Sequence, residues 1–193
     1  MAQFLKETLP RTKKIDVASG FFNVSGFAKI RDELWNTSKQ NGFNMRLLFG
    51  REAQINETPE TVSCVGQDTT LNDELVHLAI TEQTAKLIDN LIDFLKQDAV
   101  QVRKNPRRFN HAKCYIFDEC AAVGSSNFTG AGLEHNIELN AVLYQPSAQE
   151  KVQEWFERRW KEGQDAKTEL IELLESSKFG LPLEPYRMYM KFL

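Results

Sequence analysis

The 193-residue sequence predicts an α/β fold, a sandwich in which a central mixed β-sheet is flanked by helices. Two observations support this prediction. Residues 72–99 and 147–162 carry apolar side chains at helical spacing, and the chain between them contains short segments rich in β-branched and aromatic residues, which are typical of strands. The length suits one domain, or one domain with a short extension.

The first half of the chain alternates strand and helix patterns. Gly20 interrupts an apolar run and indicates a bend or a close backbone approach within a strand. Ile30, Leu34 and Trp35 are spaced for one buried helix face. The predicted segments are a strand over residues 15–25, a helix over 28–41, a strand over 44–49 and a loop over 51–70.

The second half begins with the clearest helical pattern of the chain. Leu75, Leu87, Leu91 and Leu95 recur at helical spacing, and Asn72 or Asp73 can cap the helix that they predict. The strand patterns follow. The predicted segments are a helix over residues 72–99, strands over 100–104, 112–117, 121–123 and 137–144, and a helix over 147–162.

The C-terminal residues differ in character from the rest. Residues 165–178 predict a charged helix, Gly and Pro residues break the pattern after it, and residues 186–193 form an amphipathic run that is still apolar where it stops. We expect a docked C-terminal helix or the start of a further region. The predicted organisation is one domain over residues 1–163 and an extension over residues 164–193.

Composition excludes several classes of protein. Hydrophobic residues make up 41% and charged residues 26% of the chain, which excludes a disordered, collagen-like or fibrous protein. The 24 Lys and Arg residues against 27 Asp and Glu residues give a net charge of −3, so the overall charge does not indicate a nucleic-acid partner.

The cysteines and the N-terminus indicate a cytoplasmic protein. Cys64, Cys114 and Cys120 have no CxxC spacing, and with only 3 His residues they exclude a standard zinc site and suit a reducing compartment. Lys6 and Glu7 interrupt the N-terminal apolar residues, so we expect no signal sequence, and no apolar run approaches the ~18 residues of a membrane span.

The candidate catalytic and phosphate-binding residues lie after residue 110. If residues 112–117 and their neighbours form a strand, His111 and Lys113 point to the same side, because residues two apart share a face. Residues 124–127 supply backbone, hydroxyl and amide donors of the kind that bind a phosphate oxygen. Glu138, on a third predicted strand, could orient the His111 ring as a carboxylate does in a catalytic triad.

These residues resemble the HKD motif of the phospholipase D superfamily in kind and in order. The resemblance implies a phospholipase D-like α/β/α sandwich and a metal-independent phosphodiesterase without a cofactor. In such an enzyme His111 would attack phosphorus to form a phosphohistidine. The matching residues are His111, Lys113, Asp118, Gly124, Ser125, Asn127 and Glu138.

The resemblance also implies a role for each of the other residues. Lys113 and Asn127 would hold the non-bridging phosphate oxygens with help from Ser125, and Glu138 would orient and polarise His111. Asp118, at the end of its strand, is expected to fix local structure, and Gly124 belongs to the motif.

One active site in this family needs two copies of the motif, and the chain has one. Neither His77 nor His135 is followed two residues later by Lys. We therefore expect a homodimer in which two chains face each other across a twofold axis and share one site.

The charges beside the motif favour a nucleic-acid substrate. Arg103, Lys104, Arg107, Arg108 and Lys113 are five positive charges without an acidic residue between positions 103 and 113. We expect a nuclease acting on DNA or RNA, with DNA preferred, and no membrane partner. The motif region also resembles N-terminal domains of bacterial helicase-like and restriction proteins. The alternatives are a nucleic-acid-binding module that does not cleave and a lipid phosphodiesterase.

Overall fold

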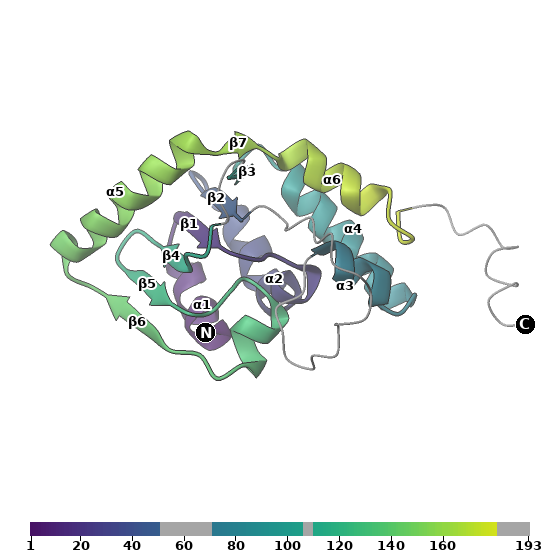
Figure 1. The fold of residues 1–193 in the computed structure, drawn as a ribbon, viewed down its shortest axis with the longest axis horizontal. Helices are drawn as coiled ribbons and strands as arrows, with labels where there is room; N and C mark the ends of the chain where they lie inside the picture. The colour runs from purple at the N-terminus through teal and green to yellow at the C-terminus, as the bar shows by residue number, and fades with distance from the viewer. Residues whose placement is uncertain (51–70, 106–109, 181–193) are drawn as a thin grey trace, which may run out of the picture.

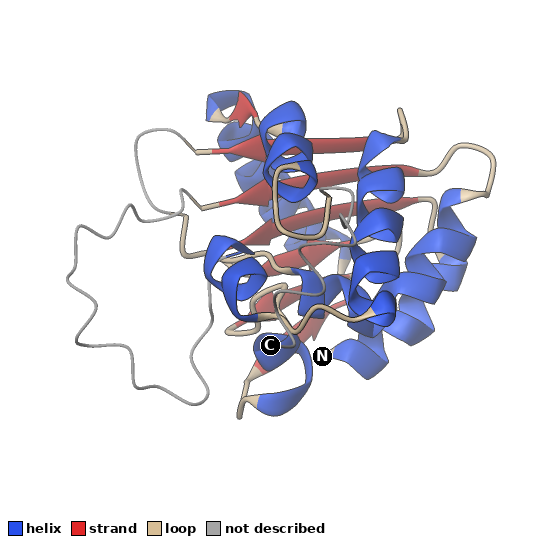
Figure 2. Cartoon of the chain, turned by 90° about the vertical axis from the view of Figure 1, so that its right-hand side faces the viewer, coloured by secondary structure: helices blue, strands red, loops and turns tan. Residues whose placement is uncertain are grey.

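One seven-stranded mixed sheet organises the computed structural model, which describes residues 1–50, 71–105 and 110–180. The three strands β1, β2 and β3 are parallel, and the others join the sheet antiparallel (Figures 1 and 2). The order is β6-β5-β4-β1-β2-β3-β7. The strands are β1 (Lys14–Ser19), β2 (Asn44–Phe49), β3 (Val100–Lys104), β4 (Cys114–Ile116), β5 (Ala121–Gly124), β6 (Asn140–Leu143) and β7 (Gln164–Asp165).

Helices cover both faces of the sheet, which confirms the predicted α/β sandwich. Alternate residues of β1 point to opposite faces, since Ile15 and Val17 belong to the main core, and Ala18 belongs to a smaller cluster beneath α5. The helical segments are α1 (Ala2–Thr8), η1 (Leu9–Arg11), α2 (Val24–Ser38), α3 (Leu71–His77), α4 (Glu82–Lys96), the π-helical turn η3 (Ala131–His135), α5 (Pro146–Glu162) and α6 (Lys167–Glu175). No described helix is both long and apolar enough to cross a membrane.

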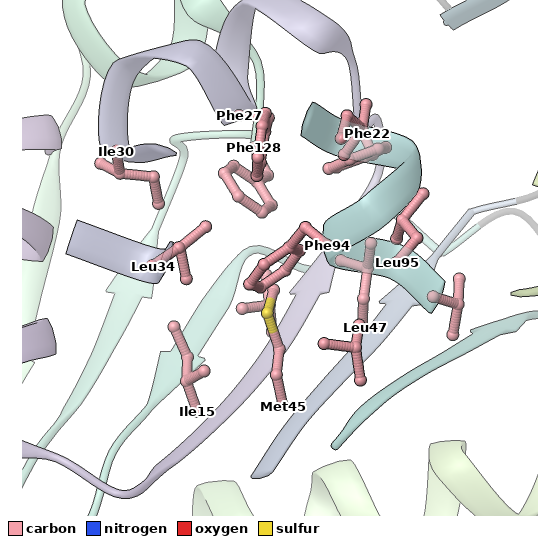
Figure 3. Packing of buried hydrophobic residues seen from close by; sticks show 14 of the residues in the cluster. Ile15, Phe22, Phe27, Ile30, Leu34, Met45, Leu47, Phe94, Leu95 and Phe128 are labelled. Carbon is pink, nitrogen blue, oxygen red and sulfur yellow. The ribbon is translucent and has the colours of Figure 1, made fainter. Parts of the chain in front are cut away.

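The main core lies between the sheet and the helices α2 and α4. Figure 3 shows Phe27 of α2 and Phe94 of α4 above the apolar side chains of the parallel strands, and their ring centroids are 5.6 Å apart. Met45 and Leu47 of β2 are buried beneath them. Burial of each such side chain contributes roughly 1.5–3 kcal/mol, so this layer holds the parallel strands in place.

The structure corrects two helix predictions. The helix predicted over residues 72–99 is two helices, because the Thr81 hydroxyl accepts a hydrogen bond from the N–H of Thr84 at 3.1 Å and starts α4 anew. The helix predicted from residue 28 begins at Val24, since the Asn23 side chain caps it by accepting from the N–H of Gly26 at 2.9 Å. The strand predicted over residues 15–25 accordingly ends at Ser19, whereas the strands over 44–49 and 100–104 are confirmed.

The predicted loop over residues 51–70 lies outside the described residues. Residues 164–180 pack on the rest of the fold. β7 pairs with β3, and Leu170 and Leu174 of α6 are buried in the main core. Residues 181–193, which include the predicted amphipathic run, also lie outside the described part of the chain.

A buried carboxylate anchors the start of α2. Glu74 of α3 accepts hydrogen bonds from the N–H groups of Val24 at 2.6 Å and Ser25 at 3.0 Å, and from the Ser25 hydroxyl. An acidic group at the N-terminus of a helix binds its unsatisfied N–H groups and suits the helix dipole. Burial raises the pKa of Glu74, and the hydrogen bonds from Ser25 and Val24 oppose that rise.

The raised pKa predicts how a Glu74→Gln variant responds to pH. The folded chain holds the Glu74 proton more tightly than the unfolded chain, so wild-type stability falls as pH rises through and above the ordinary Glu pKa of about 4.3. Glutamine has no such proton to lose. We expect the variant to gain stability relative to wild type between about pH 4 and about pH 7, measured by urea unfolding. The same difference at both pH values would contradict this.

Candidate active site

His111 lies three residues before the start of β4 and not on the strand. The pairing of β4 with β1 starts at Cys114, opposite Ala18 near the end of β1, so the strand prediction for residues 112 and 113 was wrong. His111 is exposed and Lys113 is buried. The Lys113 ammonium donates a hydrogen bond to the His111 carbonyl oxygen at 2.8 Å, and it therefore braces the backbone that carries the imidazole.

The segment that follows β1 holds the Asn127 side chain in place. Its side-chain oxygen accepts hydrogen bonds from the N–H groups of Gly20 at 3.0 Å and Phe21 at 3.3 Å, and the residue is only 2% exposed. The oxygen is used in this way, and the Nδ2 group is the donor group of the Asn127 side chain.

Ser19 completes this arrangement, and the sequence analysis did not identify it. Its hydroxyl accepts from the N–H of Phe128 at 2.8 Å and lies 3.3 Å from the Asn127 oxygen. The available signal was a small polar residue at the end of a central strand, directly before Gly20, which is where open α/β sheets place their sites.

Ser125 and Glu138 contact each other directly. The Ser125 hydroxyl donates to the Glu138 carboxylate and accepts from the N–H of Leu139 at 3.0 Å. The other Glu138 oxygen accepts from the Asn136 amide at 3.3 Å. The structure thus brings two predicted site residues together, and it adds Asn136 as a residue that positions the carboxylate.

Glu138 is not on a strand, which corrects the sequence analysis. β6 begins at Asn140, and residues 137–139, which precede it, are not part of a strand. Its predicted role in orienting His111 stays a prediction.

A tight packing contact holds this segment against β5. A Cβ atom on Gly124 would lie 2.3 Å from both the Leu139 carbonyl oxygen and the Asn140 side-chain oxygen. Asn140 also donates to the Ser126 hydroxyl at 2.7 Å. Only glycine allows this approach, so Gly124 fixes the distance between Ser125 and the residues around Glu138.

Asp118 contacts the two residues just before β1, Thr12 and Lys13, and not the other motif residues. Its carboxylate accepts from the Thr12 hydroxyl at 3.0 Å and from the N–H of Lys13 at 2.7 Å. These contacts tie the end of β4 to the start of β1. They are of the structural kind expected of this residue.

The described basic residues before His111 contact the C-terminal elements. Arg103 donates to the Trp160 carbonyl oxygen at 2.8 Å and lies over its ring, with 4.8 Å from the guanidinium carbon to the ring centroid. Lys104 pairs with Glu169 of α6. Arg107 and Arg108 lie outside the described residues, so the predicted nucleic-acid contact of all four stays a prediction.

A groove of about 380 Å³ lies between α5 and the strands β4 and β5, and His111 and Lys113 are among the residues that line it. Val123, Val152 and Trp155 contribute apolar lining. Cys114 lines it as well, but burial raises the pKa of this thiol to about 12, so Cys114 is a buried apolar residue and not a nucleophile.

The residues of the site suit anion chemistry. In the described residues, no group of three or more His, Cys, Asp and Glu side chains could hold a metal ion. The site offers a lysine ammonium, an asparagine amide, a serine hydroxyl and an exposed imidazole. Together these groups can bind phosphate oxygens and supply a nucleophile or a proton.

Comparison with known proteins agrees with this chemistry. Residues 5–160 match a family described as cardiolipin synthase, PLD-like domain. No curated protein matches the sequence. Among solved structures, Nuc from Salmonella typhimurium, a phospholipase D family member, is similar with a TM-score of 0.55 and 17% identity over 84% of this chain and 88% of that chain. NucT from Helicobacter pylori is similar with a TM-score of 0.52 and 12% identity over 84% and 89%.

The two structural likenesses concern the fold, and the family match covers most of the chain and the whole of the site from His111 to Glu138. The chain therefore belongs to the phospholipase D superfamily, as a PLD-like domain.

Proposed function

We propose that this protein is a metal-independent hydrolase of phosphodiesters, a nuclease that cleaves DNA in preference to RNA. The observation that carries the proposal is the juxtaposition of the motif residues on adjacent segments of the sheet. The Lys113 carbonyl oxygen accepts from the N–H of Gly124, and the next residue, Ser125, binds Glu138 and Leu139. Backbone pairing thus brings the segments that carry Lys113, Ser125 and Glu138 side by side, which supports the proposal.

The reaction would proceed in two displacements at phosphorus. In the first, an imidazole nitrogen of His111 forms a bond to phosphorus while the bond to the leaving oxygen breaks, and that oxygen takes a proton from a second histidine. In the second, water attacks the phosphohistidine and gives its proton back to the second histidine, and the His111 nitrogen leaves. Lys113 and Asn127 would balance the charge on the non-bridging oxygens throughout.

The second histidine would come from a second copy of the chain. A homodimer with a twofold axis near the site would supply an equivalent His111, whereas His77 and His135 have no lysine two residues after them. Each chain would then provide one half of a shared active site.

DNA is the proposed substrate because of the basic residues that precede His111. Arg107 and Arg108 join Arg103, Lys104 and Lys113 in that run, and a polyanionic backbone suits it. Lys104 would have to exchange its partner Glu169 for a phosphate to take part. We further propose that the domain acts in the cytoplasm as the N-terminal part of a larger helicase-like or restriction protein.

A lipid phosphodiesterase is the second candidate, and the groove beside His111 favours it. Val123, Val152 and Trp155 would accept an apolar group next to the reacting phosphate. A module that binds nucleic acid without cleaving it would use the same phosphate-binding residues but would show no turnover.

The test is cleavage in the presence of a chelator. Purified wild-type protein with excess EDTA is incubated with single-stranded DNA, duplex DNA, RNA and phospholipid vesicles. We expect DNA products, with less product from RNA. Turnover of the vesicles alone would establish the lipid candidate, and salt-dependent binding of DNA without products would establish the binding module. A requirement for a divalent ion would refute the metal-independent mechanism.

A further inference from the structure

The helix α5 contributes two side chains to the groove beside His111 that the proposed two-step reaction does not use. Lys151 and Trp155 both line the groove. They are four residues apart, so they lie on the same face of α5 and about one turn, or ~6 Å, from each other along its axis. Lys151 is exposed, and Trp155 is partly buried. The helix therefore adds a cation and a large aromatic ring to the groove that holds the proposed nucleophile.

Contacts within the described part of the chain leave both side chains accessible from the groove. Lys151 forms no ion pair with any described residue. The next two aromatic rings of α5, Phe156 and Trp160, stack on each other with their centroids 5.7 Å apart, whereas no described aromatic ring pairs with Trp155. Trp155 packs only against the margin of the smaller core cluster. An accessible indole beside a cation is the combination on which proteins stack the bases of a nucleic-acid strand.

The charges of the groove suit more than one phosphate. His111, Lys113 and Lys151 line it, and no acidic side chain of the described residues does. The Lys113 ammonium is bonded to the His111 backbone, where the reacting phosphate is proposed to bind. Lys151 is therefore a second cation, for which a lipid with one phosphodiester has no partner. A polynucleotide carries a further phosphate on the next nucleotide, together with a base.

We infer that Lys151 and Trp155 form a subsite for the nucleotide next to the scissile phosphate. The Trp155 indole stacks on the base of that nucleotide, and the Lys151 ammonium binds its second phosphate. This inference rests on the proposed function, because it takes a nucleic acid as the substrate. Val123 and Val152 extend the apolar surface around the ring. Since every base has a π-face, the subsite accepts all bases and recognises nucleic acid without reading its sequence.

The test uses oligonucleotides that separate stacking from charge. One is a single strand of about 12 thymidine nucleotides, and the other is an abasic strand with the same number of phosphates and no bases. Fluorescence anisotropy of the labelled strands gives the dissociation constants in EDTA, and every chain carries His111→Ala so that the strands are not cleaved. The added substitutions are Trp155→Ala, Trp155→Phe and Lys151→Ala. Lys86→Ala is the charge-matched control, because Lys86 is exposed on α4, which packs on the main core and not on the cluster beneath α5.

We expect the chain with both Lys151 and Trp155 to bind the thymidine strand at least about 5-fold more tightly than the abasic strand. Trp155→Ala should abolish this difference, and Trp155→Phe should keep most of it, because phenylalanine still offers a ring. Lys151→Ala should weaken the binding of both strands by the same factor and make it less dependent on salt. Lys86→Ala should change neither. Circular dichroism checks that each variant is folded, and Trp155→Leu replaces Trp155→Ala if the latter does not fold.

Three results would overturn the inference. If the chain with both residues binds the two strands equally while wild-type protein cleaves DNA, the subsite is refuted and the proposed nuclease stands. If neither strand binds and wild-type protein cleaves no DNA, the subsite and the proposed function both fail. If Trp155→Ala weakens the binding of phospholipid vesicles and leaves the two strands alike, the groove binds a lipid and not a base.

Discussion

Replacing His111 with alanine will lower phosphodiester cleavage by at least about 10³-fold, because the variant loses the group that forms the bond to phosphorus. The exposed imidazole belongs to no structural core, so the free energy of unfolding should stay close to that of wild type. Steady-state cleavage of DNA in EDTA measures the first effect, and urea unfolding measures the second. Cleavage that survives the substitution would refute the proposed mechanism.

His135→Ala is the matched control for this experiment. His135 is also exposed and lies in η3, on the segment that leads to Glu138, but it has no lysine two residues later. We expect near wild-type activity. If both substitutions abolish cleavage, the loss reflects damage to this end of the sheet and not the removal of a nucleophile.

Mixing wild-type and His111→Ala chains tests whether the site is shared. When the chains exchange freely in a 1:1 mixture, about a quarter of the dimers contain two wild-type chains. A site that needs both histidines should therefore retain about a quarter of the wild-type activity, whereas independent sites should retain about half. The two models therefore predict different residual activities for the same mixture. The residual activity is expressed relative to wild type, so it does not depend on protein yield.

The sequence predicts the sheet more reliably than the ends of its elements. The strands over 44–49 and 100–104 are found with the predicted bounds. Both place buried apolar residues at the two-residue spacing of a strand, such as Met45 and Leu47 or Val100 and Val102. The two helices α3 and α4 were predicted as one, because their apolar spacing continues across the break. The break at Thr81 depends on a single capping hydrogen bond, and a threonine within a helical pattern does not reveal whether it caps.

The sequence predicts which residues belong to the candidate site but not the contacts that hold them in place. Motif residues identified His111, Lys113, Ser125, Asn127 and Glu138, and the structure brings Ser125 and Glu138 into contact. The support from residues 20–21 could not be predicted, since it joins positions more than 100 residues apart through backbone N–H groups, which carry no side-chain signal. The buried ion pair of Asp16 and Arg46 also went unnoticed, because single charges within strands look like exposed residues in a sequence.

That ion pair sits beneath α5. Asp16 is fully buried, and both of its oxygens accept hydrogen bonds at 2.7 Å from the Arg46 guanidinium. Arg46 also binds Glu157 of α5 and lies over the Phe156 and Trp160 rings. Burial alone would lower the pKa of Arg46, but the hydrogen bonds that Arg46 donates to Asp16 and Glu157 outweigh it and raise the value. The hydrogen bond from Arg46 in turn lowers the pKa of Glu157.

We expect Asp16→Asn to lower the free energy of unfolding by about 3 kcal/mol, the lower end of the ~3–5 kcal/mol that breaking a buried pair costs. Asparagine has the shape of aspartate but leaves the partly buried Arg46 charge beside a neutral group, and the remaining bond to Glu157 limits the loss. Urea unfolding measures the effect, and the slope of the free energy of unfolding against urea concentration should stay unchanged. A loss below about 1 kcal/mol would mean that solvent reaches Arg46 and that the pair is not truly buried.

Two further variants separate charge from packing. Glu162→Gln removes the exposed pair with Arg159 on the same helix and should change stability by less than about 0.5 kcal/mol. Asp16→Leu combined with Arg46→Met should recover most of the loss, because apolar residues of similar volume can replace a buried pair.

α5 also carries Val152 and Trp155 of the groove beside His111. If Asp16→Asn loosens α5, substrate affinity should weaken before the chain unfolds, and the double substitution should restore it, since the ion pair acts on the site only through the position of this helix.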